Sequence, residues 1–551
     1  MRTMRVILAS GIAVAAGLFT VDASAQISSV GALTKQVTTA NGATQSQVNT
    51  AVAVQTMCNY LKTPVGGGYR LPSATSAGPP LTTAPGDLFL RCNELVQTAA
   101  SLQGVKTTRS LGLGSNGLFG AVQQVSGVQL AAQRTMTTQV PAGQFANINS
   151  RIDALRYGVS NAALRGRVSA FNTVPSGDDN GSAPITDTYH LASNFDDIDD
   201  YSAEGVHSSF THASYGATGG DQSPAASSSR SPMPAMAVSN PWGLFSEGSY
   251  DFGNRDQTSE EDAFNYYAKS ITLGLDYNFG HAVAGASIGY DSYNANFQAN
   301  GVSNAGGSSS VEGTTGSLFG AWFGPHWFFD GIASYGSIHT DVVRIVNYAP
   351  VPQTPPQCQN AACGVDVFLK GSPRGKNAAV GATAGYDLFA GGWDFSPTLS
   401  VNYRHISIDS YGETDLTLAT TPVGSGLPLK YGSQSINSLR SVLGIVVTRP
   451  LSFGFGVLSP NLRLDWDHEY QNEASTIQAQ YVADNSITTV RKCASCFLIP
   501  TERPARDFGT VGVGLSALFS NRWQGYLSYE RLIGVSYLTS NAITLGVRAQ
   551  F

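Results

Sequence analysis

The second half of the chain contains twelve segments in which apolar and polar residues alternate, and this pattern restricts the fold more than any other feature. In the second segment, Ile271, Leu273 and Leu275 share one face, whereas Thr272 and Asp276 share the other. Successive side chains of a strand point to opposite faces, so the pattern predicts strands with one apolar face. The twelve segments begin near Trp242, Tyr267, His281, Thr315, Trp327, Asn377, Trp393, Asn437, Leu458, Thr510, Trp523 and Asn541.

The connections between these segments distinguish a membrane barrel from a soluble β-sandwich, whose strands also alternate. Turns after even-numbered segments are short, as at 324–326, whereas those after odd-numbered segments are mostly long and hydrophilic, as at 347–375 and 471–507. Short turns at one end and long loops at the other are typical of outer-membrane barrels. The predicted fold class is therefore mainly β, with a twelve-stranded antiparallel transmembrane β-barrel over residues 241–551.

Tryptophans and charged residues fit the same prediction. Trp242, Trp327, Trp393 and Trp523 cluster at the short-turn ends, where an interfacial aromatic girdle would lie. Only 13% of residues are charged and 60 are glycine, so the polarity comes largely from small uncharged residues that suit a wet lumen. The charges expected on the lumen face are Asp276, Arg463, Asp465, Asp467, Glu530 and Arg548.

The last predicted strand runs from Asn541 to Phe551. Its apolar face carries Leu545, Val547 and the terminal Phe551. A final strand needs a neighbour to cover its hydrogen-bonding edge, so we expect it to pair with the first strand and close the barrel.

The N-terminus has the features of an export signal. Arg2 and Arg5 precede an apolar stretch over 6–20, and Ala23 and Ala25 form an A-x-A cleavage site. The apolar stretch is shorter than the ~20 residues that a spanning helix needs. Residues 1–25 are therefore predicted to be a signal peptide.

Residues 26–171 are predicted to be a small helical region. Apolar residues at helical spacing near Val48 and near Leu88 indicate two helices joined by a loop over 63–85, with Asp87 as a helix N-cap. The G-x-G-x-x-G sequence at 112–117 lacks a βαβ context and is predicted to be a turn before a helix from Leu118 to about Thr138. A second, partly polar helix over 144–171 could lie in a pore or in a small bundle.

The six cysteines form three separated pairs. An even number of cysteines in an exported protein indicates disulfides rather than free thiols. The C-x-x-C at 493–496 lacks the context of a redox motif, so a loop disulfide is favoured there. The expected pairs are Cys58 with Cys92, Cys358 with Cys363, and Cys493 with Cys496.

Residues 172–240 are rich in Ser, Gly, Ala, Asp and Pro and are predicted to be a flexible linker. The acidic run Asp196–Asp200 offers oxygen ligands for calcium but lacks the glycine turn and spacing of a known loop. A solvated acidic run is the favoured interpretation.

Taken together, these features resemble a bacterial autotransporter of type Va secretion. The signal, the N-terminal passenger-like region, the helix 144–156 and the twelve-stranded C-terminal region carry the resemblance. It implies an outer-membrane bilayer around the barrel, periplasmic chaperones, and a barrel-assembly machinery that reads Leu545, Val547 and Phe551. Some members cleave themselves between paired asparagines in the linker helix, but here Ile148 separates the two asparagines.

The predicted function is that of an outer-membrane autotransporter whose barrel anchors, and translocates or displays, its own short passenger at the surface or in the periplasm. The alternatives are a surface adhesin that uses its long loops, and a passive pore with a periplasmic plug. No catalytic constellation, cofactor site or metal site is expected. The net charge of -6 argues against a nucleic-acid partner, and we expect a monomeric barrel.

Overall fold

The computed structural model describes residues 31–40, 42–71, 81–159, 241–301, 303–351, 363–417, 425–486, 493–519 and 523–550. The predicted signal peptide, the predicted linker with its acidic run, Cys358 and Phe551 lie outside these ranges.

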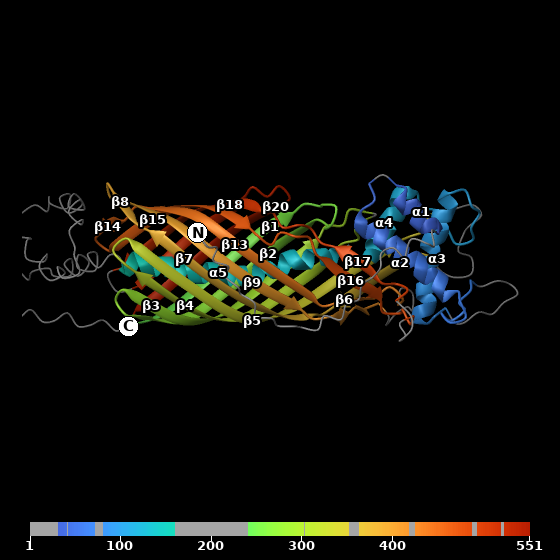
Figure 1. Cartoon of the computed structure of the whole chain (residues 1–551), viewed down its shortest axis with the longest axis horizontal. Helices are drawn as coiled ribbons and strands as arrows, with labels where there is room; N and C mark the ends of the chain where they lie inside the picture. Colours follow the sequence, from blue (N-terminus) through green and yellow to red (C-terminus); the bar gives the residue numbers. More distant parts are fainter. Residues whose placement is uncertain are drawn as a thin grey trace, which may run out of the picture.

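Twelve long strands form a closed antiparallel barrel in which each strand pairs with its neighbours along the chain (Figure 1). The last strand closes the barrel on the first, from the pair Gly243 and Gln550 to the pair Arg255 and Leu538, as predicted. The strands are β1 (Trp242–Arg255), β2 (Phe264–Asn278), β3 (Ala282–Phe297), β4 (Gly307–Phe323), β5 (Trp327–Tyr348), β7 (Arg374–Tyr386), β9 (Trp393–Ile408), β13 (Gln434–Thr448), β15 (Gly456–Glu469), β18 (Asp507–Phe519), β19 (Trp523–Ile533) and β20 (Leu538–Gln550).

All twelve predicted strands are present, but one predicted boundary is wrong. Strand β4 begins at Gly307 rather than near Thr315. The glycine and serine residues at 307–310 show no apolar alternation, yet they pair with β3 on one side and with β5 on the other. Hydrogen bonding to both neighbouring strands therefore extends β4 into a segment whose side chains do not alternate between apolar and polar.

The outer face of the barrel is apolar, whereas its inner face carries buried polar residues as well as apolar ones. Leu273 and Leu275 on β2 are about half exposed, whereas Thr272 and Asp276 on the same strand are fully buried. Trp242, one of the predicted girdle residues, is likewise half exposed on the outer wall. Such a wall is the solution that a strand protein adopts in lipid, where every backbone polar group has to be paired within the sheet.

The two ends of the barrel differ in size, as predicted from the connections. At the short-turn end, β8 (Leu388–Ala390) and β14 (Leu451–Phe453) only lengthen two hairpins. At the long-loop end the loops fold into extra sheet (Figure 1). Its strands are β6 (Val365–Gly371) and β11 (Thr414–Asp415) beside β5, and a separate sheet of β10 (Tyr411–Gly412), β12 (Leu429–Tyr431), β16 (Thr476–Tyr481) and β17 (Phe497–Pro500).

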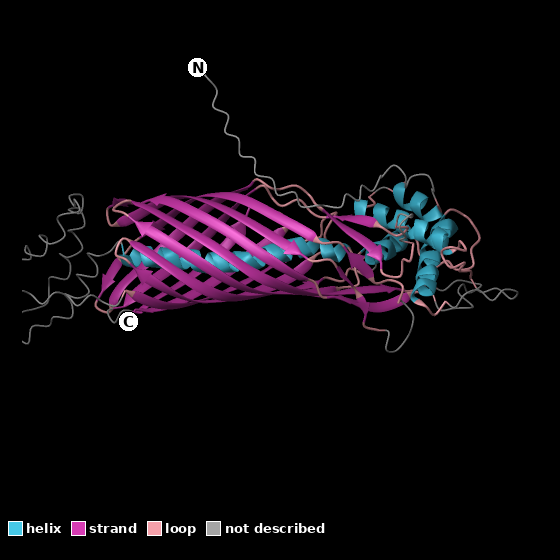
Figure 2. Ribbon diagram, turned by 60° about the horizontal axis from the view of Figure 1, so that its bottom comes forward, coloured by secondary structure: helices cyan, strands magenta, loops and turns pink. Residues whose placement is uncertain are grey.

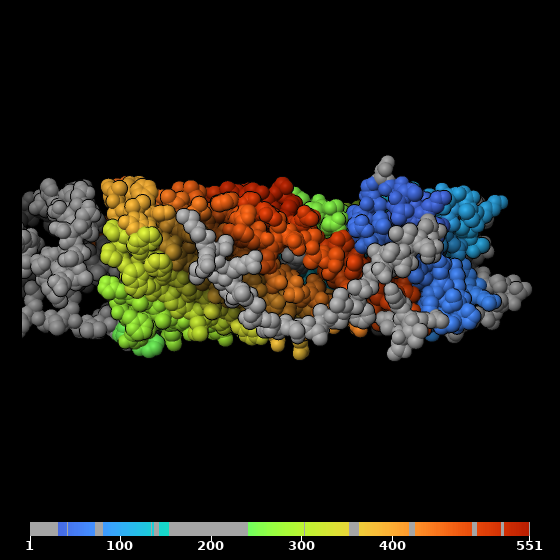
Figure 3. Space-filling view, in the orientation of Figure 1, coloured from blue at the N-terminus to red at the C-terminus, as the bar shows by residue number. Residues whose placement is uncertain are grey.

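The described residues between 31 and 131, which we call the cap, form a helical unit on the long-loop end (Figures 1 and 3). Thr44 caps α2 through a capping box with Gln47, and Thr83 caps α3. The prediction that Asp87 is the N-cap was wrong, because Pro85 lies in the first turn after Thr83 and leaves Asp87 inside the helix. The helices are α1 (Ala32–Thr38), α2 (Gln45–Leu61), α3 (Ala84–Leu102), α4 (Ser115–Ser126) and the 3-10 turn η2 (Val128–Ala131).

The last helix, α5 (Ala132–Val159), runs along the inside of the barrel (Figure 2). The predicted break near Thr138 is wrong: α4 ends at Gly127, whose φ of 69° stops the helix, and α5 continues past Pro141. The expected helix over 144–171 is confirmed up to Val159, and the residues after it are not described. None of the described helices is both long and apolar enough to cross a membrane.

Candidate functional site

Helix α5 passes through the lumen from the long-loop end to the short-turn end. Near its start, Thr135 contacts Glu261 in the loop between β1 and β2, with 3.3 Å between Oγ1 and Oε2. Near its end, Arg151 binds Asp276, two residues before the end of β2 at the opposite rim. The sequence left open whether this helix lies in a pore or in a bundle, and the structure places it in the pore.

One side of the helix is hydrogen-bonded to the inner wall formed by β2 and β3. The side-chain amide of Gln144 donates to Ser270 Oγ at 2.8 Å and to Asp291 Oδ1 at 3.0 Å. Gln144 Oε1 accepts from Thr272 Oγ1 at 2.7 Å. One turn further on, Asn147 Nδ2 donates to Ser270 and Thr272 at 3.1 and 2.8 Å. All these side chains are buried, so each bond replaces one that water would otherwise make.

A buried carboxylate links the helix to both strands that flank β1. Asp276 Oδ2 accepts from Arg151 Nε at 3.2 Å and forms a salt bridge with its Nη2. The other oxygen, Oδ1, accepts from Arg548 of β20 at 3.0 Å. Arg151 also lies over the ring of Phe245 on β1, 5.0 Å from its centroid. Asp276 therefore holds the helix and the β1–β20 closure together.

The inner wall leaves room for the helix at glycines. A Cβ atom at Gly289 of β3 would lie 1.7 Å from Gln144 Oε1, and one at Gly381 of β7 would lie 2.8 Å from the ring of Phe145. Phe145 packs in an apolar cluster with Ile148 and Ile152 of the helix and the wall residues Phe245, Val283, Phe319, Phe328, Ile332 and Ala379.

The opposite inner wall, formed by β15, β18 and β19, contacts the helix less. Arg463 Nη1 lies 3.5 Å from Asp153 Oδ2, and both side chains remain about one-third exposed. A polar hollow remains between Ser150 and this wall, lined also by Gly512 and Gly514. The lumen charges predicted on β15, β19 and β20 do face inward, but only Arg548 joins the Asp276 link.

The cap is attached to the barrel loops through buried charged groups. Arg91 of α3 donates to the Gly364 carbonyl at 2.6 Å and to Glu94 at 2.7 Å. Glu94 also accepts from Arg109 at 2.8 Å. Burial raises the pKa of Glu94 to about 7, although the two arginines act in the opposite direction. Asp87 accepts the backbone N–H of Gly426 from a second loop at 3.0 Å.

A second set of buried polar contacts between barrel and cap is centred on a strand residue. Arg344 of β5 donates to Glu413 at 2.9 Å and to the Gln124 carbonyl of α4 at 2.9 Å. Glu413 also accepts from the Tyr431 hydroxyl at 2.9 Å. Around these polar contacts, one apolar core combines cap residues such as Leu88 and Val122 with loop residues from β6, β12, β16 and β17.

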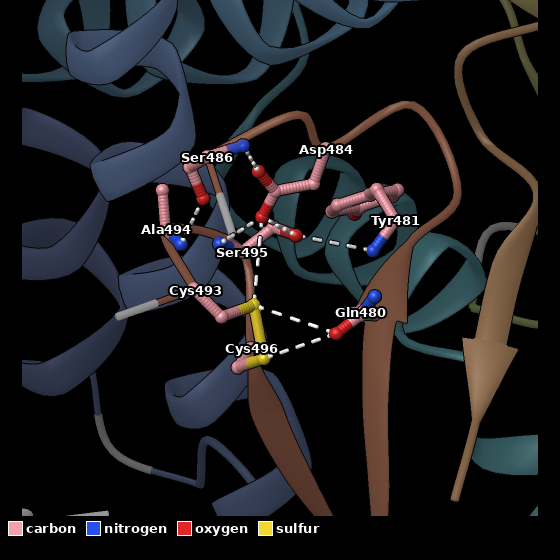
Figure 4. The surroundings of a disulfide bond; sticks show 8 residues. All are labelled: Gln480, Tyr481, Asp484, Ser486, Cys493, Ala494, Ser495 and Cys496. Carbon is pink, nitrogen blue, oxygen red and sulfur yellow. Dashed lines mark hydrogen bonds between the residues drawn. A yellow bond between two sulfur atoms is a disulfide. The ribbon is translucent and has the colours of Figure 1, made fainter. Parts of the chain in front are cut away.

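Both the cap and the barrel loops that contact it contain a disulfide. Cys58 and Cys92 join α2 to α3, as predicted. Cys493 and Cys496 form the predicted loop disulfide before β17, and Asp484 organises the loop by accepting the Ser495 N–H at 2.8 Å (Figure 4). Cys363 is also disulfide-bonded.

Sequence reasoning identified the lumen side of this site better than the cap side. The alternation of β2 put Ser270, Thr272 and Asp276 on the inner face, where the helix binds them. The Arg91–Glu94 pair and the Arg344–Glu413 pair were missed. The spacing of Arg91 and Glu94 on one helix was visible, but their loop partners lie some 270 residues away in sequence. No cluster of three or more His, Cys, Asp or Glu residues that could hold a metal occurs in the described part of the chain.

Comparisons with known proteins agree with this architecture. The sequence matches the model of the autotransporter beta-domain over residues 244–530, more than half of the 551 residues. A search of curated proteins gives no match.

Similar solved structures include three autotransporter domains. The translocator domain of NalP from Neisseria meningitidis is 15% identical, with a TM-score of 0.42, over 57% of this chain and 89% of that one. The beta domain of the Bordetella autotransporter BrkA is 16% identical, with a TM-score of 0.37, over 56% and 100%. The transport unit of AIDA-I from Escherichia coli is 13% identical, with a TM-score of 0.36, over 58% and 93%. With its twelve-stranded barrel and its match to a translocator family that is not enzymatic, this chain belongs to the autotransporters of the bacterial outer membrane.

Proposed function

We propose that this autotransporter places its own cap on the cell surface and keeps it there, docked on the barrel loops. The observation that carries the proposal is the path of α5, which enters the lumen beside the long loops and ends beside the short turns. Outer-membrane barrels have their long loops outside and their short turns in the periplasm. In this orientation the chain before α5 is extracellular.

The cap–loop interface supports retention rather than release. Its apolar core is shared between cap and loops, and Arg91, Glu94 and Arg344 cross it while nearly fully buried. Separating the two sides would expose these charges and the shared core to water. Each hydrogen bond from a charged side chain across the interface, such as that from Arg91 to the Gly364 carbonyl, contributes about 1.5–3 kcal/mol.

Antibody access to epitope tags on intact cells tests the proposal. An epitope tag inserted at exposed Val65 in the cap should be reached by antibody on intact cells, and it should stay with the membrane fraction. A matched tag in the short turn at 279–281 should be reached only after permeabilisation. A cap tag that is protected on intact cells would contradict surface placement, and a tag recovered in the medium would contradict retention.

We also propose that the barrel-assembly machinery recognises the last strand and that the chain depends on periplasmic chaperones before insertion. Leu545 and Val547 of β20 support this, because they present an apolar outer face next to the closing edge. Substituting Leu545 with Asp should lower the amount of heat-modifiable barrel in the outer membrane, whereas the inward Thr544→Ser control should not. Equal barrel levels for both variants would contradict this role.

A further inference from the structure

The exposed charges of the cap are all positive. Residues 31–131 contain six Lys or Arg residues and two acidic ones, although the whole chain has a net charge of -6. Both acidic residues, Asp87 and Glu94, are buried and form salt bridges with Arg91 or Arg109. The four remaining cations are all exposed, and they are Lys35, Lys62, Arg70 and Lys106. The surface of the described cap is therefore basic, with no exposed carboxylate.

Two of these cations lie together at the start of helix α3. Lys62 directly follows the last residue of α2, and the N–H of Tyr69 donates to the Leu61 carbonyl at 3.0 Å. This hydrogen bond brings Arg70 beside Lys62. The Tyr69 hydroxyl lies 3.4 Å from Oγ1 of Thr83, the N-cap of α3. The first cation pair is therefore next to the N-terminus of α3.

The other two cations lie at the opposite end of the same helix. Gln103, the C-cap of α3, donates to the Ala32 carbonyl of α1 at 2.8 Å. Lys106 follows Gln103 by three residues, and Lys35 follows Ala32 by three residues on α1. The 19 residues of α3 span roughly 28 Å at the rise of an α-helix. One small anion cannot contact both cation pairs, whereas a linear polymer can.

The surroundings of the cations favour a sulfated polymer over a nucleic acid. Within the described part of the chain, none of the four cations forms a salt bridge. The large apolar side chains exposed on the described cap are Val65, Leu102 and Val105, so no aromatic ring is offered to stack on bases. Two neighbouring cations at each end call for closely spaced anionic groups. A sulfated polysaccharide carries such groups more densely than a polymer with one carboxylate per repeat.

We propose that the cap binds a linear sulfated polysaccharide, whose chain runs along α3 from one cation pair to the other. Each pair alone gives a weak contact in water, but joining the two contacts through one polymer chain raises the affinity without any new contact. The inference rests on the proposed function, because a cap on the cell surface is the one that meets such a polymer.

The test uses the purified full chain in detergent, titrated with heparin chains long enough to span α3 and with a heparin disaccharide. The wild type should bind the long chain at least about 30-fold more tightly than the disaccharide, because only the long chain joins both pairs. The double variant K62Q/R70Q should bind the long chain roughly tenfold more weakly, with about half the salt dependence, because two of the four cations are lost. K35Q/K106Q should behave in the same way.

Two control variants separate charge from structure. K62R/R70K keeps both charges and should bind as the wild type does. R374Q/K376Q removes two exposed cations from the barrel wall instead of the cap, and it should also bind as the wild type does.

Several outcomes would overturn the proposal. Equal binding by K62Q/R70Q and wild type would, and so would equal affinity for the disaccharide and the long chain. Binding of hyaluronan as tightly as heparin would exclude sulfate recognition, and equally tight binding of duplex DNA would assign the surface to nucleic acid. Competition by millimolar inorganic sulfate would assign it to free anions. Binding by purified protein does not depend on where the cap lies in the cell, so a failure of the whole-cell tag experiment is distinguishable from a failure of this surface.

Discussion

The two walls of the lumen make different contacts with helix α5. The wall of β1 to β3 binds it through Gln144, Asn147 and Arg151, all buried. Among the side chains that the structure describes, the wall of β15 to β19 meets the helix through a long, partly exposed ion pair and borders a polar hollow. The comparison shows that the helix is held unevenly. It is bound by the first strands of the barrel, β1 to β3, and makes weaker contacts with the opposite wall.

The largest effect should come from Asp276→Ala on the binding wall. This change leaves Arg151 and Arg548 without the carboxylate that they share, and breaking a buried pair costs about 3–5 kcal/mol. We expect a lower temperature for the heat-modifiable gel shift and a rise in planar-bilayer conductance as α5 leaves the lumen. Unchanged conductance would mean that the helix is held by other contacts.

A smaller effect is expected from Gly289→Ala on the same wall. The added methyl group meets Gln144 at 1.7 Å, so the glutamine has to give up its bonds to Thr272 and Asp291. Overpacking of this kind costs about 1–3 kcal/mol. The matched control on the opposite wall is Gly512→Ala, where the nearest atom is the flexible Glu530 side chain at 3.0 Å. Equal gel-shift temperatures for the two variants would remove the proposed asymmetry.

The loop above the binding wall should make stability depend on pH. Burial raises the pKa of Asp262 to about 7, while a hydrogen bond from Gln123 acts in the opposite direction. A carboxyl whose pKa is raised on folding favours the folded state at low pH, and that contribution is lost as pH rises from about 4 through 7. Lowering the pH from 8 to 5.5 should therefore stabilise the protein by on the order of 1 kcal/mol or more. Asp262→Asn should flatten this dependence in thermal melts, and an unchanged slope would assign it to other groups.

The smallest effect is expected from Asp153→Asn, which faces the loose wall. Its ion pair with Arg463 is long and about one-third exposed, so it should contribute at most about 1 kcal/mol, and Arg463 keeps its 2.7 Å salt bridge with Asp465. Conductance and gel-shift temperature should stay close to those of the wild type. A conductance rise as large as that of Asp276→Ala would show that this wall holds the helix as strongly as the wall of β1 to β3 does.

The barrel was predictable from sequence because its information is local. Alternation along a strand such as β2 and the lengths of turns and loops are properties of neighbouring residues, and the pairing of β20 with β1 follows once closure is assumed. Even so, the start of β4 was missed, since glycine and serine carry no alternation.

The position of α5 and the attachment of the cap were less predictable. A polar helix is compatible with a pore or a bundle, and only the match of Gln144 to Ser270 and Asp291 decides between them. The predicted helix end near Thr138 does not exist, and the αL residue Gly127 ends α4 instead. The cap's polar anchors pair residues such as Arg91 and Gly364 that are distant in sequence, and no local pattern encodes such pairs.

The bond between Cys58 and Cys92 has a consequence for export. It ties α2 to α3 across 34 residues, so once it is formed the two segments cannot thread in single file. If the two cysteines are oxidised before translocation, the channel must be wide enough for two chain segments side by side. If they are oxidised afterwards, an oxidant must be present outside the cell. The time at which this disulfide forms therefore sets the minimum internal diameter that the translocation channel must have.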